Sequence, residues 1–151
     1  NYALKMLNDK MRADDIVQDV FIKLFENINN IHNKQSIQFW LFKTARNEMM
    51  SFLRNTKNKK FITEAVDIET FEIENKTSLA DEIENTELKK LILNELEVMN
   101  EDFSEVFILK EYSGLSYKEI ASLLDIDEEL VKSRLYKARQ KLISKISKVL
   151  Q

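Results

Sequence analysis

Residues 116–142 read SYKEIASLLDIDEELVKSRLYKARQKL, and this stretch predicts two helices joined by a tight turn. Ser116 and Glu119 have the spacing of a capping box, which starts the first helix. Asp125 falls at the turn, where left-handed backbone is expected and Asp is tolerated better than most residues. Asp127 is placed to cap the second helix. The stretch therefore predicts a helix-turn-helix.

The second helix of this pair is strongly basic. From residue 132 to the end of the chain there are seven basic side chains and no acidic one. Val131 and Leu135 are expected to point inward, which leaves the basic side chains on the outer faces. A short helix followed by a longer basic helix is a common way to enter the major groove of DNA. On these residues alone, an ordinary helical hairpin with a solvated basic end remains an alternative.

The composition predicts an all-α protein. One Gly and no Pro in 151 residues favour helix nearly throughout. No Cys is present, which excludes disulfides and thiolate metal sites, and the single histidine, His32, is expected to be exposed in a polar loop. No apolar run approaches the roughly 18 residues of a membrane span, and no signal peptide is visible. We therefore expect no membrane insertion and a cytoplasmic location.

Charge is segregated along the chain. The net charge is −3 overall, but it is +5 for residues 1–60, −8 for residues 61–88 and 0 for residues 89–151. Residues 132–151 alone carry +7. A nucleic-acid partner responds to such a local field more than to the total, so the acidic total does not exclude DNA binding.

Three parts follow along the chain. Residues 1–60 are expected to be helical, with helices over 14–28 and 37–54 and with Ser36 as the cap of the second. The first of these helices carries an apolar stripe at helical spacing. Its members are Ile16, Val17, Val20, Phe21, Leu24, Phe25 and Ile28. Residues 61–85 are predicted to form an acidic linker, and residues 86–151 to form four helices that end in the helix-turn-helix.

Two separated stretches resemble one family. ADDIVQDVFIKLFENI at 13–28, followed by FWLFKTARNEMMSFLR at 39–54, resembles conserved region 2 of bacterial sigma factors. MNEDFSEVFILKEYSGLSYKEIASLLDIDEELVKSRLYKARQKL at 99–142 resembles region 4. The chain is similar to the extracytoplasmic-function (ECF) type of the sigma-70 family of RNA polymerase sigma factors. This resemblance implies two small helical domains, a region 2-like domain over 1–60, truncated at its amino end, and a region 4-like domain over 86–151.

The resemblance assigns the outer face of the 14–28 helix to RNA polymerase. Asp15, Gln18 and Asp19 match the polar positions that dock on the clamp coiled coil of the core enzyme in this family. Ile22 is a weaker extra candidate. Without the resemblance, a solvated polar face is the simpler interpretation of these residues.

The resemblance assigns the 37–54 helix to the minus-ten promoter element, which such proteins melt and hold as a single strand. Aromatic and basic side chains suit this task, because unpaired bases stack on rings while cations hold phosphates. Trp40 matches a tryptophan of the family, but on a wide apolar face it is expected to belong to the core. Ser51 stands where the family often has Asp. The candidates for strand contact are Lys43, Arg46, Asn47 and Arg54.

The basic helix is assigned by the same resemblance to the minus-thirty-five element in duplex form. Arg139 and Lys141 are expected to contact phosphates. Asp125 replaces the usual Gly of the family at the turn, which predicts slight strain there. The candidates for base edges or nearby phosphates are Lys132, Ser133, Arg134 and Lys137.

The sequence thus predicts a sigma factor whose partners are core RNA polymerase and promoter DNA, with an anti-sigma factor as a further candidate partner. The alternative is a helix-turn-helix transcriptional regulator that does not associate with the core enzyme. An enzyme is disfavoured, because no Gly-rich phosphate loop, metal-ligand cluster or nucleophile with a histidine partner is visible. We expect no catalytic residue, metal, cofactor or small-molecule substrate.

Overall fold

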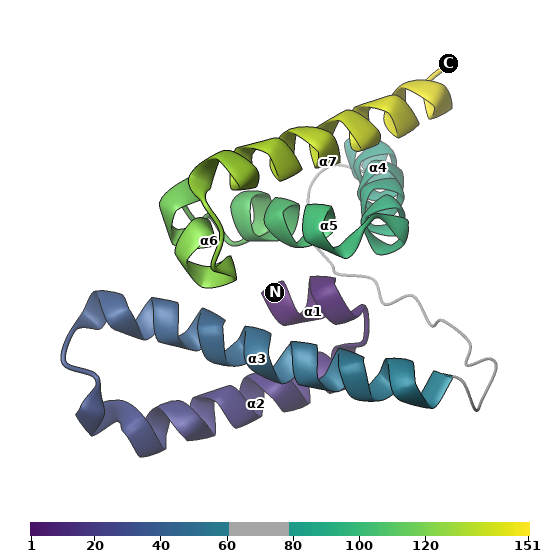
Figure 1. The fold of residues 1–151 in the computed structure, drawn as a ribbon. Coiled ribbons are helices and arrows are strands. Elements are labelled where there is room, and N and C mark those ends of the chain that lie inside the picture. Colours follow the sequence, from purple (N-terminus) through teal and green to yellow (C-terminus); the bar gives the residue numbers. More distant parts are fainter. Residues whose placement is uncertain (61–78) are drawn as a thin grey trace.

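The computed structural model describes residues 1–60 and 79–151, and it describes side chains for residues 1–56 and 86–151. Within these ranges every regular element is a helix (Figure 1). We call residues 1–60 the N-terminal module and residues 79–151 the C-terminal module. The N-terminal helices are α1 (Tyr2–Leu7), α2 (Lys10–Asn27), the 3-10 turn η1 (Ile28–Asn30) and α3 (Lys34–Lys60). The C-terminal helices are α4 (Leu79–Val98), α5 (Glu101–Phe107), the π-helical turn η2 (Ile108–Tyr112), α6 (Tyr117–Leu124) and α7 (Glu128–Val149).

The N-terminal module is an antiparallel pair, α2 and α3, with α1 packed against it (Figure 1). Helix α2 begins earlier than predicted because Asp9 caps it, accepting a hydrogen bond from the Arg12 N–H at 3.1 Å. The predicted cap at Ser36 is wrong. Helix α3 starts at Lys34, and the Asn33 side chain accepts a hydrogen bond from the Gln35 N–H, so Ser36 lies inside the first turn.

The apolar stripe of α2 is only partly buried among the described residues. Ile16 and Val20 are in the core, whereas Phe21 is 55% exposed and Phe25 is 82% exposed. Val17 and Ile28 are exposed as well, so only part of the stripe faces the core. The reason is geometric. Helices α1 and α3 cover one side of α2, and the stripe is wider than that side.

The C-terminal module confirms the predicted helix-turn-helix. Both hydrogen bonds of the Ser116–Glu119 capping box are present at the start of α6. Asp125 is left-handed at φ 56° and ψ 48°, and the Asp127 side chain caps α7 by accepting from the Leu130 N–H at 2.7 Å. Val131 and Leu135 are fully buried, so α7 has one face in the core and the others outside.

Two further boundaries decide how the C-terminal module is built. Helix α4 begins at Leu79, inside the range 61–85 that we predicted as a linker, while 61–78 lies outside the described residues. Helix α5 continues into the π-helical turn η2, which ends at Tyr112. Gly114 follows two residues later, and its φ of 71° suits a residue without a Cβ.

The two modules pack directly against each other. Helix α1 lies on η2, and α3 lies on α6 (Figure 1). Tyr2 is 6% exposed between the modules, and the Lys5 ammonium sits 4.1 Å from the centre of the Tyr112 ring. Burial lowers the pKa of Lys5 and raises that of Tyr112. The sequence predicted two separate helical domains but not this contact.

Candidate nucleic-acid and polymerase interfaces

Helix α7 lies on the far side of the C-terminal module from α2 and α3 (Figure 1), and most of its basic side chains are exposed. Lys132, Ser133 and Lys137 are exposed on it, as are Arg139 and Lys141. The Lys137 and Lys141 ammonium groups lie 5.7 Å and 5.5 Å from the centre of the Phe103 ring of α5, within the range of a cation–π contact. These side chains are thus held near the protein surface while their charges stay in water.

Acidic neighbours pair with three basic side chains of α7, namely Arg134, Arg139 and Lys132. The Arg134 Nη2 lies 3.1 Å from the Asp102 Oδ2, and the Arg134 side chain is 20% exposed at the edge between α5 and α7. Arg139 pairs with Glu111, and this hydrogen bond raises the pKa of Arg139. Lys132 bonds to Glu129 at 2.9 Å, which raises the pKa of Lys132. Each pair is partly or fully solvent-exposed, so a phosphate can displace the carboxylate at small cost.

Sequence reasoning missed an aromatic side chain, Tyr117, beside this surface. The Tyr117 ring, at the start of α6, has the Lys110 ammonium 4.6 Å and the Lys132 ammonium 5.9 Å from its centroid. Lys110 also donates to the Leu115 carbonyl at 3.2 Å, which anchors it next to the turn before α6. The sequence signal for this site was an aromatic residue, Tyr117, directly after the Ser116 cap of the helix-turn-helix.

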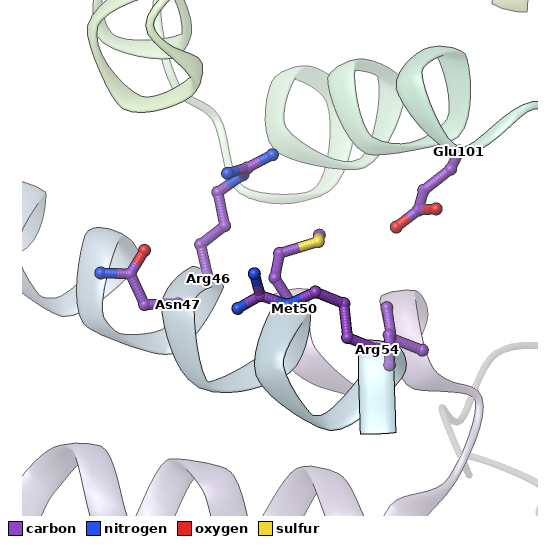
Figure 2. A pocket seen from close by; sticks show the side chains of 6 residues that line it. Arg46, Asn47, Met50, Arg54 and Glu101 are labelled. Atoms are coloured by element: carbon purple, nitrogen blue, oxygen red, sulfur yellow. The ribbon is translucent and has the colours of Figure 1, made fainter. Parts of the chain in front are cut away.

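The four strand-contact candidates on α3 divide into two pairs. Asn47 and Arg54 are exposed and line an open hollow of about 500 Å³ together with Met50 and Glu101 (Figure 2). Arg46 also borders this hollow, but its guanidinium extends toward α5 (Figure 2). The Lys43 Nζ donates to the Leu123 carbonyl of α6 at 3.3 Å. Arg46 and Lys43 therefore point into the contact between the modules.

Arg46 meets a buried carboxylate. Its Nε and Nη2 donate to the two carboxylate oxygens of Glu105 at 2.8 Å and 3.2 Å, and Glu105 is 2% exposed. Tyr2 Oη donates to Glu105 Oε1 at 2.5 Å. Burial, and then the charge of Glu105, raise the pKa of Tyr2. Burial alone would lower the pKa of Arg46, but the hydrogen bonds and charge of Glu105 outweigh it and the pKa is raised.

The candidates for polymerase contact lie on a third face. Asp15, Gln18 and Asp19 are exposed on α2, the helix farthest from the C-terminal module (Figure 1). Their spacing of three and four residues puts them side by side. Ile22, the weaker candidate, is 51% exposed and follows them one turn later. The structure thus exposes the α2 group as one cluster of side chains, but it divides the α3 group, because Lys43 and Arg46 turn into the contact between the modules while Asn47 and Arg54 stay exposed.

The described residues hold no cluster of His, Asp or Glu side chains that could bind a metal ion. No helix among them is long and apolar enough to cross a membrane.

Comparisons with known proteins agree with this division. Residues 1–59 match the family described as Sigma-70 region 2, and residues 89–142 match Sigma-70, region 4. Among curated proteins, the chain is similar to the ECF RNA polymerase sigma-E factor of Haemophilus influenzae, with 29% identity over 140 residues that cover 87% of this chain and 73% of the relative. It is also similar to the ECF RNA polymerase sigma factor SigM of Bacillus subtilis, with 28% identity over 141 residues that cover 93% and 83%.

Solved structures show the same fold. One is the sigma factor RpoE of Bartonella quintana in complex with the anti-sigma factor NepR, with a TM-score of 0.76, 25% identity and coverage of 97% of this chain and 88% of that one. A second is CnrH in complex with the cytosolic domain of CnrY, with a TM-score of 0.65, 20% identity and coverage of 97% and 78%.

Proposed function

The chain belongs to the sigma-70 family, among its ECF sigma factors, and we propose that its three exposed groups divide the work of such a factor. A sigma factor directs RNA polymerase to promoters and binds both the core enzyme and promoter DNA. The observation that supports the proposal most is the order of the parts. A helix with an exposed acidic and amide face, the helix α3 that we assign to the single strand and a basic helix-turn-helix follow one another, and the matches to region 2 and region 4 stand in the same order.

We assign Asp15, Gln18 and Asp19 to core polymerase. The three side chains are exposed together on α2, which lies at the edge of the N-terminal module farthest from α7 (Figure 1). This separation lets the polymerase hold the chain without covering the side chains that we assign to DNA.

The outer face of α7 is assigned to the minus-thirty-five duplex. Arg134 and Lys137 lie toward the first half of α7, where the helix-turn-helix presents a recognition helix to base edges. Arg139 and Lys141 lie further along and suit phosphates. Lys110 and Tyr117 extend this surface beyond what the sequence predicted.

The α3 side chains are assigned to the melted minus-ten strand. Asn47 and Arg54 already face an open hollow that is large enough for parts of a nucleotide. Lys43 and Arg46 would join them once the modules separate. This assignment needs no covalent chemistry, so the chain acts as an initiation factor and not as an enzyme, and its place of action is the bacterial cytoplasm.

An anti-sigma factor is the further partner that we propose. The sigma factor RpoE of Bartonella quintana is bound to the anti-sigma factor NepR in its structure, and CnrH is bound to the cytosolic domain of CnrY. In this chain such a partner would act by covering the α3 and α7 surfaces together.

In-vitro transcription with core polymerase on a small promoter library tests the proposed function. We expect core-dependent initiation from a subset of templates. Asp19→Lys should reduce it at least about tenfold, because an acidic face docks on a basic one and like charges in contact across an interface cost several kcal/mol. Glu97→Lys is the matched control, since Glu97 is an exposed acid on α4 outside all three groups. The absence of any core-dependent transcript, together with no retention of core polymerase in a pulldown, would favour a plain helix-turn-helix regulator.

A further inference from the structure

Glu105 is a buried acid whose polar partners come from the other module. Within the described residues its carboxylate accepts three hydrogen bonds, two from Arg46 of α3 and one from Tyr2 of α1. We propose that Glu105, Arg46 and Tyr2 form a latch that holds the two modules closed and withdraws α3 from single-stranded DNA. The DNA part of this inference rests on the proposed function, whereas the closed state itself does not.

The latch is a buried ion pair in which both carboxylate oxygens accept hydrogen bonds. A carboxylate that is 2% exposed is tolerated only when its charge and lone pairs are satisfied, and here one guanidinium and one phenol do so. Both partners become hydrated when the modules separate. Removing Arg46 while the modules stay closed leaves an unpaired buried charge, and removing the Tyr2 hydroxyl takes one hydrogen bond from the buried carboxylate, so the closed state depends on all three side chains.

Contacts on either side of the latch support the closed state. The Tyr2 ring packs against Phe42 of its own module, with 5.6 Å between ring centres, and this contact fixes the ring whose hydroxyl meets Glu105. The Lys43 ammonium bonds the Leu123 carbonyl in the last turn of α6, where helix carbonyls lack partners within the helix and a cation is favoured. The Lys5 ammonium over the Tyr112 ring is a further contact between the two modules.

Closure affects the two DNA surfaces unequally. Lys43 and Arg46 are committed to the C-terminal module, and Glu101 adds negative charge to the hollow that Asn47 and Arg54 line (Figure 2). The outer face of α7 stays exposed. The closed chain is therefore able to meet duplex DNA through α7 before it can hold a single strand through α3.

A phosphate of an unpaired strand is the natural competitor for the latch. Carboxylate and phosphate both bind a guanidinium through two parallel hydrogen bonds, so Arg46 can exchange Glu105 for a strand phosphate. Single-stranded DNA and closure then compete for the same side chain, and each weakens the other.

Two variants test the latch in the full chain. Tyr2→Phe keeps the ring and removes one hydrogen bond to a charged group, which is expected to shift the opening equilibrium about tenfold or more. Glu105→Gln removes the charge. Glu95→Gln is the matched control, because Glu95 is a largely buried acid on α4 that faces Lys145 within the same module, at 3.7 Å.

The readout is the distance between spin labels on Gln38→Cys of α3 and Ser122→Cys of α6, which are exposed positions on two helices that pack across the contact between the modules, in a chain without native cysteine. We expect a single short distance for the parent and for Glu95→Gln, and an added longer population for Tyr2→Phe and Glu105→Gln. Binding of a single-stranded oligonucleotide should tighten in the same two variants, up to about tenfold if the parent is open about 10% of the time.

The outcomes separate the two proposals. Unchanged distances in both latch variants would overturn the latch, whether or not the chain supports transcription. If Glu105→Gln fails to fold, Tyr2→Phe decides the question alone, since its ring and packing are kept. Longer distances without any core-dependent transcription would support the latch and overturn the proposed function.

Discussion

Arg134 on α7 and Asp102 on α5 form an ion pair, with the Arg134 Nη2 3.1 Å from the Asp102 Oδ2. The pair sets the resting position of a side chain that we assign to base reading. Because the Asp102 side chain is 58% exposed, the pair contributes little to stability. We expect the Asp102 carboxylate to compete with DNA for the Arg134 guanidinium instead.

Replacing Asp102 by Asn should therefore strengthen duplex binding. We expect the dissociation constant for a minus-thirty-five duplex to fall roughly twofold to fivefold, in line with about 0.4–1 kcal/mol for a partly exposed ion pair. Fluorescence anisotropy with a labelled duplex measures this. Glu95→Gln, with the same change in charge, should leave the constant unchanged, and weaker binding by Asp102→Asn would contradict the assignment of Arg134.

Alanine substitutions of Arg134 and of Lys141 should weaken duplex binding in different ways. Arg134→Ala is expected to cost about 1–3 kcal/mol on the preferred duplex and to relax sequence preference at one position. Lys141→Ala should weaken binding to all duplexes alike and flatten the log–log salt slope by about 0.9. Titrations at several salt concentrations, on the preferred and a scrambled duplex, separate the two. Identical behaviour of the two variants would show that α7 only holds phosphates.

The turn between α6 and α7 holds Asp125 in left-handed backbone at φ 56°. Asp125→Gly should raise the free energy of unfolding by roughly 1 kcal/mol, since a residue with a Cβ is strained there. Ser122→Gly, inside α6 where the backbone is ordinary helix, should lower it. Chemical unfolding followed by circular dichroism compares them, and a destabilised Asp125→Gly would mean that the Asp side chain itself stabilises the turn.

Local features of the chain could be predicted from sequence because their causes are local. The Ser116–Glu119 box and the Asp127 cap each depend on residues three positions apart, and the left-handed Asp125 follows from the turn between them. Ser36 shows the limit of this reasoning. Asn33 and Ser36 are both good capping residues, and only the fold shows that the chain uses the first.

The contact between the modules could not be predicted in this way. Tyr2 and Glu105 are 103 positions apart, and neither has a neighbour that marks it as a partner. Glu105 stands beside Val106 in an apolar helix, where an acid is expected to turn outward, and it is buried because Arg46 and Tyr2 meet it. The family resemblance named Arg46 as a DNA contact, but the closed state that occupies Arg46 comes from the structure alone.

Alkaline pH should weaken the wild-type chain through Tyr2. Burial, and then the charge of Glu105, hold the pKa of Tyr2 above its ordinary value of 10.0. A pKa that is raised in the folded state gives stability that is complete below about pH 10 and is lost as pH rises further, because the unfolded chain gives up the proton first. The groups that face the hydroxyl are the Glu105 carboxylate of α5, which accepts its hydrogen bond, and the Arg46 guanidinium of α3 bound to the same carboxylate.

The matched comparison is Tyr2→Phe, which lacks the proton. Between about pH 10 and 11 the free energy of unfolding of the wild type should fall more steeply than that of the variant, by up to about 1.4 kcal/mol per pH unit. Urea unfolding at closely spaced pH values gives both slopes. Parallel slopes would mean that Tyr2 titrates normally and does not hold the modules together.

Footprinting of a promoter fragment with core polymerase tests most directly whether two surfaces of this chain act on two elements of one promoter. With the wild-type chain we expect two separated protected segments and permanganate-reactive thymines only in the downstream one. Lys137→Ala should remove the upstream protection, and Arg54→Ala should remove the thymine reactivity. A single protected segment that is the same with and without core polymerase would contradict the account.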